Sequence, residues 1–296
     1  MDWTTGVARA IDYIEAHLTE EIDYEQVGSQ AYCSVYHFQR VFSILCGFTL
    51  GEYIRKRRLT LAGAELRGGG KVIDVALKYG YENPDSFTRA FAGFHGVNPS
   101  EVRGGTAALK SFSRLHLKFS LEGGQIMDYR IEEIPARVYT GYKRHFQGAP
   151  GNRFEQEQDF FCNTRANQYL LQGMADDPCV TYNLIVNIDD EGYDFYIAAL
   201  LPGHMRERIE EDCVLGKADA ARFEMIEIPK TTYAVFETGR AKFPTRLHME
   251  LRRRAVSEWL PGSGYELAPG AEVNVIHWYR KPDKEKRYIE LWLPVG

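Results

Sequence analysis

The sequence predicts an all-α domain with two helix-turn-helix units, followed by an α+β domain with an internal pseudo-twofold repeat. Three observations support this fold class. The first hundred residues repeat one helix-turn-helix pattern about fifty residues apart. A glycine pair at 104–105 ends this region, and two later segments recur at offsets of 94 and 92 residues. We therefore expect domains at 1–105 and 127–296, joined by a linker at 106–126.

The first helix-turn-helix is expected to begin at Asp23 and to turn at Tyr32-Cys33. Ser34 can cap its second helix. The apolar positions of that helix recur at i, i+3, i+4 and i+7, which marks a core-facing stripe: Phe38, Val41, Phe42 and Leu45. The opposite stripe carries hydrogen-bonding side chains of the kind that read base edges in a major groove: Tyr36, Gln39, Arg40 and Ser43.

The second helix-turn-helix repeats the plan with different residues. A short helix starting at Val72 is expected to stop at Gly80, after which Asn83 caps and Pro84 opens a second helix. Its apolar stripe has the same spacing: Phe87, Ala90, Phe91 and Phe94. Its outer face carries Asp85, Ser86, Thr88 and Arg89. Asp85 also suits the N-terminal end of a helix dipole.

A single helix over Leu50–Leu66 is expected to connect the two units and carries a basic cluster at 55–58. The whole chain has net charge -5, but residues 40–103 hold ten basic and six acidic residues. Arg55 and Arg58 are therefore candidates for phosphate contacts, although a solvated helix face gives the same pattern.

The run from Ala76 to Pro99 resembles the C-terminal signature of the AraC/XylS family of transcription regulators. Tyr36–Arg40 resembles the family's first recognition helix, and the resemblance covers about residues 5–103. It implies two DNA-reading helices that enter major-groove segments ~34 Å apart. Double-stranded DNA and RNA polymerase are the implied partners. The candidate DNA contacts are Ser34, Tyr36, Gln39, Arg40, Ser43, Arg55, Arg58, Asp85, Ser86, Thr88 and Arg89.

The second domain contains the internal repeat. Glu133–Tyr139 aligns with Glu227–Tyr233, and Tyr196–Pro202 aligns with Tyr288–Pro294. Each half is expected to supply an early strand, a helix and two later strands, with the helices near 154–171 and 247–260. Two similar halves predict a groove between them.

The last strand offers a candidate ligand surface. Alternation places Ile289, Leu291 and Leu293 in the core and turns Tyr288, Glu290 and Trp292 to the other face. Two aromatic rings around a carboxylate suit a flat cation, with a ring contribution of roughly 0.5–2 kcal/mol. Trp259 either walls the groove or belongs to the core. A solvated strand with Glu290 paired to a neighbour such as Arg287 remains the alternative.

Residues 127–296 resemble the GyrI-like effector-binding domain, which implies a small aromatic or cationic effector. The leading hypothesis is a ligand-responsive transcription regulator. One alternative is a DNA-binding activator whose second domain is structural or binds a protein. Another is hydrolysis of a reactive small molecule, with Glu290 as base. We expect no enzyme and no catalytic residues, because the spacing shows neither a Ser-His-Asp nor a Cys-His arrangement.

Composition indicates an ordinary globular protein. No apolar run approaches ~20 residues, which predicts a cytoplasmic protein without membrane contact. The five cysteines are scattered and lack metal-ligand spacing, so we expect no metal and no cofactor.

Alternation of Leu115, Leu117, Phe119 and Leu121 suggests that the linker forms a strand.

Overall fold

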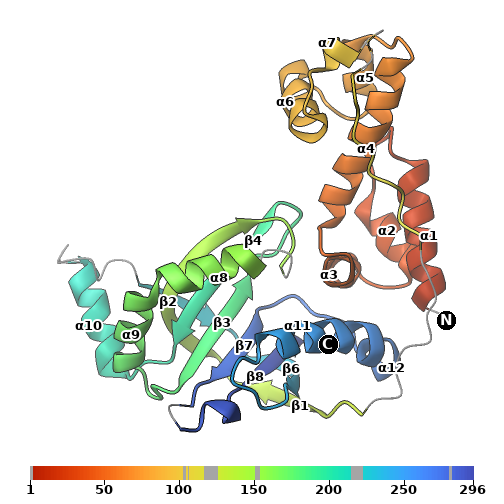
Figure 1. Cartoon of the computed structure of the whole chain (residues 1–296). Coiled ribbons are helices and arrows are strands. Elements are labelled where there is room, and N and C mark those ends of the chain that lie inside the picture. The colour runs from red at the N-terminus through yellow and green to blue at the C-terminus, as the bar shows by residue number, and fades with distance from the viewer. Residues whose placement is uncertain are drawn as a thin grey trace. The chain divides into compact units, whose positions relative to one another are not determined.

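The computed structural model describes residues 3–102, 105, 107–116, 126–150, 154–214, 223–279 and 282–296. It divides into two compact units, one of residues 1–39 and 50–121 and the other of residues 40–49 and 122–296 (Figure 1). Each unit is described by itself. The boundaries expected from the sequence, 1–105, 106–126 and 127–296, stay a prediction.

The N-terminal region is helical. Its helices are α1 (Trp3–Ala16), α2 (Tyr24–Ala31), α3 (Val35–Cys46), α4 (Leu50–Arg67), α5 (Val72–Lys78), α6 (Pro84–His95) and α7 (Pro99–Val102). The pairs α2–α3 and α5–α6 are the two helix-turn-helix units predicted from the sequence, and α4 is the helix between them (Figure 1).

The helices begin at the residues that the sequence indicates. The Asp23 carboxylate accepts a hydrogen bond from the Glu25 amide at 2.8 Å, and the Asn83 side chain accepts one from the Asp85 amide at 2.8 Å. Ser34 Oγ accepts from the His37 amide at 3.2 Å. These caps satisfy amide groups that have no partner within the helix.

Gly28 allows the close approach in the first helix-turn-helix. A Cβ on this residue would lie 2.9 Å from Cys33 O and 3.0 Å from Val35 N, which are backbone atoms of the turn and of α3. Neither atom can move without shifting the start of α3. Glycine at this position therefore fixes how closely α2 and α3 pack.

We expect Gly28→Ala to destabilise the chain by about 1–3 kcal/mol, because the new methyl group forces backbone apart. Gly93→Ala is the matched control: Gly93 lies in α6 with nothing within 4 Å of an added Cβ. That substitution is expected to stabilise the helix by up to about 1 kcal/mol. Urea unfolding of the two variants checks the difference, and equal effects would show that the turn relaxes freely.

The core of the second helix-turn-helix is built around two phenylalanines of α6. Phe87 and Phe91 are fully buried, with ring centroids 5.4 Å apart. The residues packed around them come from α4, from α5 and the residue that caps its C-terminus, and from α7: Leu59, Ala62, Leu66, Val75, Ala76, Tyr79 and Val102. The α6 stripe thus anchors the helix as predicted, and its polar face is left outside.

Residues 107–116 run along α4 as extended chain rather than as a strand. The Phe112 amide donates to Thr60 Oγ1 at 2.9 Å, and the Leu115 amide donates to the Tyr53 hydroxyl at 3.2 Å. The expected strand is therefore absent from the described part of the linker. Leu117, Phe119 and Leu121, on which that expectation mainly depended, lie outside the described residues.

The second unit contains one antiparallel sheet of eight strands in the order β1-β6-β8-β7-β3-β4-β2-β5. The strands are β1 (Tyr129–Ile134), β2 (Arg137–Gln147), β3 (Val180–Val186), β4 (Gly192–Ala199), β5 (Glu224–Ile228), β6 (Thr231–Glu237), β7 (Glu272–His277) and β8 (Tyr288–Pro294). The helices are α8 (Phe154–Asn163), α9 (Arg165–Met174), α10 (Gly203–Val214), α11 (Thr245–Arg254) and α12 (Leu260–Ser263), with a π-helical turn η2 (Ala255–Trp259) before α12 and a 3-10 turn η3 (Lys284–Lys286).

The sheet has the pseudo-twofold symmetry predicted from the repeat. β3 and β7 pair at its centre, and the strand order on one side repeats that on the other with the halves exchanged. The first strand of each half pairs with the second strand of the other half, so that Ile134 faces Thr231 and Arg137 faces Ile228. This exchange makes the two halves one continuous sheet and confirms the predicted α+β fold.

The two faces of the sheet are covered differently. Helices lie on one face, with α8 and α9 over the first half and α11 over the second (Figure 1). The other face carries its own apolar cluster, which includes Tyr139, Leu184, Tyr196, Tyr233, Val273 and Trp292. Both faces of the central strands are consequently buried.

Candidate functional site

The outer face of α6 presents the polar residues predicted for it. Asp85 and Arg89 are exposed one helical turn apart, and Ser86 and Thr88 are half-buried beside them. The two hydroxyls donate to Asn83 O at 2.6 Å and Pro84 O at 2.9 Å, which leaves their oxygens able to accept. Among the described residues, Arg89 has no ion-pair partner. Its guanidinium is available to a partner outside the chain.

α3 carries the other predicted reading residues along one side. Ser34 caps this helix, and Tyr36 and Gln39 lie half-buried on its first two turns. Arg40 and Ser43 on the next turn are both buried: Arg40 pairs with the Glu272 carboxylate, and Ser43 Oγ donates to Arg40 O at 2.8 Å. The predicted reading face of α3 is therefore corrected: burial and the ion pair with Glu272 remove Arg40 and Ser43 from it, and Tyr36 and Gln39 are left accessible.

The basic cluster on α4 is divided between the surface and the interior. Arg55 is exposed, as a phosphate contact requires. Arg58 donates instead to Leu18 O at 2.8 Å and Glu20 O at 2.6 Å, at the end of α1. The preceding Arg57 forms two 2.8 Å contacts with the Glu15 carboxylate. The structure thus gives Arg58 a scaffold role, because it satisfies carbonyl groups at a helix end, in place of the predicted phosphate contact.

Glu290 lies in a buried polar cluster and not in a ligand groove. It is 8% exposed, and its Oε2 accepts from Trp292 Nε1 at 2.8 Å and lies 3.2 Å from Arg130 Nη2. His277 Nε2 is 3.6 Å from its Oε1. Burial would raise the pKa of Glu290, but His277, Trp292 and Arg130 hold it below the ordinary value of 4.5. The alternative of a structural ion pair fits this arrangement, with Arg130 in place of Arg287.

The other residues of the predicted ligand surface also pack within the protein. The Tyr288 ring stacks on His277 with centroids 4.1 Å apart, and the Arg240 guanidinium lies 3.4 Å from its centroid. Trp259 is half-buried and packs against the buried Phe236 ring, the exposed Tyr129 ring and the half-buried Tyr265 ring. Trp292 belongs to the apolar cluster on the sheet face without helices. The predicted ligand surface is therefore corrected: because both faces of β8 are buried, alternation did not identify the face that lines a groove.

Glu290→Gln is expected to lower the free energy of unfolding by about 1–2 kcal/mol at pH 7, because a charged acceptor of buried donors is lost. The folded pKa is lowered, so the carboxylate stabilises the fold above the unfolded value of 4.5. This contribution is lost as the pH falls through the lower folded pKa. Thermal unfolding from pH 7 to pH 3 should show the variant and the wild type converging. A difference in stability between the two proteins that stays constant from pH 7 to pH 3 would show that the charge of Glu290 does not contribute to folding stability.

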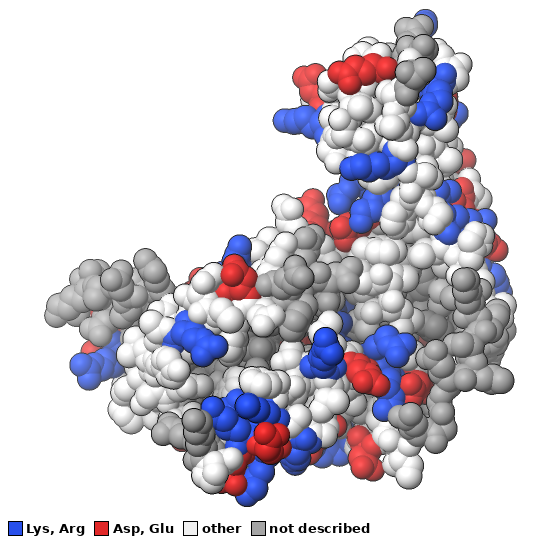
Figure 2. Space-filling view, in the orientation of Figure 1, with Lys and Arg blue, Asp and Glu red and all other residues white. Residues whose placement is uncertain are grey.

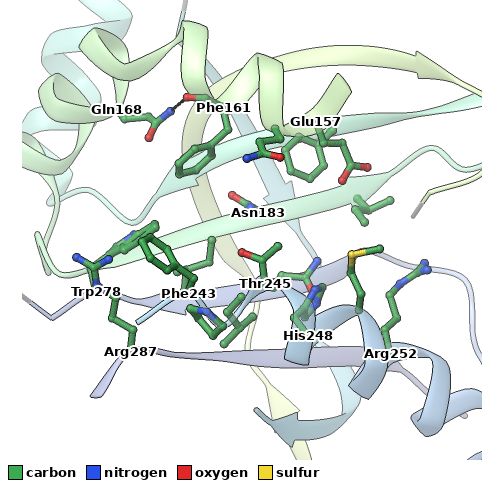
Figure 3. Close-up of a pocket in the computed structure, with 18 of the residues that line it drawn as sticks. Glu157, Phe161, Gln168, Asn183, Phe243, Thr245, His248, Arg252, Trp278 and Arg287 are labelled. Carbon is green, nitrogen blue, oxygen red and sulfur yellow. Dashed lines mark hydrogen bonds between the residues drawn. The ribbon is translucent and has the colours of Figure 1, made fainter. Parts of the chain in front are cut away.

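A groove lies on the helix-bearing face of the sheet, above the central strands β3 and β7. α8 and α9 form one wall and α11 forms the other (Figure 3). Its lining includes Glu157, Phe161, Gln168, Asn183, Thr245, His248, Arg252, Trp278 and Arg287. The residue of β8 that reaches it is Ile289. The predicted groove between the halves exists, but a different set of residues lines it.

Two asparagines form part of the groove floor at the centre of the sheet. Asn183 of β3 faces Asn274 of β7 directly in the strand register. Asn274 Oδ1 lies 2.6 Å from His248 Nε2, and burial lowers the pKa of that histidine. Asn183 Oδ1 is buried and has no hydrogen-bond partner among the described residues. A buried amide oxygen in this state is satisfied when a ligand or a water donates to it.

Two carboxylates lie at one end of the groove. Glu272 is fully buried and accepts from Arg252 Nε at 2.8 Å and Nη2 at 2.9 Å. Burial would raise the pKa of Glu272, but the neighbouring guanidinium charge, chiefly that of Arg252, lowers it. Glu157 accepts a short hydrogen bond from the Tyr193 hydroxyl, and burial raises its pKa. The first carboxylate is thus neutralised within the fold, and the second is held closer to its neutral form.

Groups of His, Cys, Asp and Glu that could hold a metal ion are absent from the described part of the chain. Within the same residues, every helix is too short or too polar to cross a membrane.

Comparison with known proteins gives each unit a family. A helix-turn-helix domain model matches residues 28–105, and the model of the integron-associated effector binding protein matches residues 130–295. The HTH-type transcriptional activator AarP of Providencia stuartii is 36% identical over 98 residues, which are 33% of this chain and 73% of AarP. The regulatory protein SoxS of Salmonella typhimurium is 35% identical over 94 residues, 31% of this chain and 88% of SoxS.

Among solved structures, an integron cassette protein from the mobile metagenome of Vibrio cholerae is similar over 57% of this chain and 95% of its own. The two are 15% identical, with a TM-score of 0.38. The sequence relatives match the helical unit and the second family model matches the sheet unit. The chain belongs to the AraC-type DNA-binding transcription regulators and carries a C-terminal GyrI-like effector-binding domain of the integron-associated effector binding family.

Proposed function

We propose that this regulator reads DNA with α3 and α6 and that its effector-binding domain senses a small aromatic molecule in the groove above β3 and β7. The observation that carries the sensing proposal is the groove itself. Phe161 and Trp278 provide flat walls, and the unsatisfied Asn183 oxygen provides a polar anchor (Figure 3). Mostly apolar clefts with a few polar groups that fix orientation are typical of ligand sites.

Exposed aromatic side chains at the rim support the same proposal. Tyr169 of α9 is 69% exposed and Phe243 is 72% exposed, and both line the groove. Large apolar side chains that gather at the opening of a pocket mark an interaction site more often than a solvated surface. An aromatic ligand would cover these rings and remove their apolar area from water.

The DNA-reading part of the proposal assigns base contacts to Gln39 of α3 and to Arg89 of α6, whereas Arg40 is buried and paired with Glu272. Glutamine and arginine make bidentate hydrogen bonds to adenine and guanine. Arg55 is assigned to phosphate. The similarity to AarP, a transcriptional activator, supports extending the proposal to activation of transcription through RNA polymerase. The proposed site of this activity is the cytoplasm.

The sensing proposal is tested by calorimetric titration of a naphthalene derivative into the full chain and two variants. Phe161→Ala, in the groove wall, should weaken binding by about 1–2 kcal/mol through loss of ring contact. Glu290→Gln, on the other face, should leave it unchanged. The bound probe should also change the affinity of the chain for DNA. If no naphthalene derivative binds, or if Phe161→Ala has no effect, the groove is not the sensor and the second domain is a structural or protein-binding module.

The hydrolytic alternative has no comparable support. It required Glu290 to activate water beside a substrate, and that carboxylate is bound to Arg130 and Trp292 away from the groove. Assay of the purified chain for turnover of ester substrates tests this alternative.

A further inference from the structure

We propose that the ligand of the groove is an aromatic anion, a flat ring system with a carboxylate or sulfonate, rather than a cation. This inference rests on the proposed sensing function and adds the charge of the ligand to it.

The balance of charge around the groove is the first observation. Among the residues that the structure describes, six basic and two acidic side chains line it. One of the acidic pair, Glu272, is fully buried and bound by Arg252 through two hydrogen bonds. The other, Glu157, is half-buried and accepts a hydrogen bond from the Tyr193 hydroxyl. A cation entering the groove would therefore find no exposed carboxylate among the described lining residues.

The position of the basic groups is the second observation. Arg287 lies at the end of the groove that Trp278 and Phe243 wall, away from Glu157 (Figure 3). Lys242, whose Nζ is 5.4 Å from the Phe243 ring centroid, and Lys284 also line the groove. Within the described residues, none of these three basic groups forms an ion pair. Figure 2 shows Lys and Arg side chains, with Asp and Glu side chains among them, near the loop that precedes β8. This end of the groove combines positive charge with flat apolar rings.

Arg287 is held in place before any ligand arrives. Its Nε donates to Tyr279 O at 3.1 Å and its Nη1 donates to Lys242 O at 3.4 Å. Its guanidinium lies 5.2 Å from the centroid of the Trp278 ring. A guanidinium fixed in this way loses little entropy when it binds an anion, and the indole offers a face to the ring of the same ligand.

The test uses three probes with one ring system: naphthalene-2-sulfonate, 2-naphthylmethylammonium and the neutral 2-naphthylmethanol. Each is titrated by calorimetry into the full-length chain at 50 and 500 mM salt. The sulfonate is expected to bind about 10-fold more tightly than the ammonium probe at low salt, and the higher salt should reduce that ratio, because exposed charges are screened.

The variant test compares the double substitution Lys242→Gln, Lys284→Gln with Lys286→Gln. Lys286 is exposed, pairs with Asp283 at 2.9 Å and does not line the groove, so its loss controls for overall charge. The double variant should lose about 5-fold or more in sulfonate affinity and little in neutral-probe affinity. The control should change neither.

The outcomes separate the two proposals. Tighter binding of the ammonium probe than of the sulfonate, or equal losses in the double variant and the control, overturns the anion assignment while the groove remains a ligand site. Failure of all three probes to bind overturns the sensing function itself. Tight sulfonate binding that depends on Lys242 and Lys284 supports both.

Discussion

Phe91→Ala is expected to lower the free energy of unfolding of the helical unit by about 3–5 kcal/mol, because it removes a fully buried ring from a small core. Phe91 packs against Phe87 and against His95, whose ring centroid lies 4.2 Å away. The ring holds α6 on α4 and α5, so its loss should also abolish specific DNA binding. Urea unfolding and a DNA-binding titration of the same sample measure the two effects.

Leu77→Ala is the matched control in the same helix-turn-helix. Leu77 lies on α5 and is 59% exposed, so its truncation should change stability by less than about 0.5 kcal/mol. Similar losses for the two variants would mean that α6 is not anchored through its apolar stripe.

Arg89→Ala is expected to weaken binding to a cognate duplex by about 1–3 kcal/mol, the free energy of one bidentate base contact. The loss should be specific, because a random duplex offers Arg89 only phosphate contacts. Arg89 is exposed and lies outside the core, so the thermal stability should stay unchanged. Fluorescence anisotropy with cognate and random duplexes makes the comparison. Equal losses on both duplexes would identify Arg89 as a phosphate contact.

The helical unit could be predicted from the sequence because its signals are local. Ser34 and Asn83 each cap a helix by accepting a hydrogen bond from an amide two or three residues later. Phe38 and Phe87 are the first residues of apolar stripes that recur once per helical turn. Each such feature is fixed by a few neighbouring residues. The same holds for the repeat in the second unit, which is visible as aligned segments and implies two similar halves.

The ligand groove could not be predicted in the same way. Its floor and walls bring together Asn183, His248 and Trp278, which are far apart in the sequence and meet only through the order of the strands. Strand alternation separated Glu290 from Ile289 correctly. It did not indicate which face the helices cover, because both faces of β8 are buried. An alternation rule identifies a solvent face only when a sheet has one.

The reading of DNA by two helices of one chain is tested most directly by a footprint. A duplex selected from a random pool by the wild-type chain is cleaved with hydroxyl radicals in the presence of wild-type protein and of Arg89→Ala, with the stoichiometry measured in parallel. One wild-type chain per duplex should protect two segments about one helical turn apart on the same face, ~34 Å. Arg89→Ala should lose protection in one segment and retain it in the other. Protection of a single segment, or two segments that require two chains, would contradict the account.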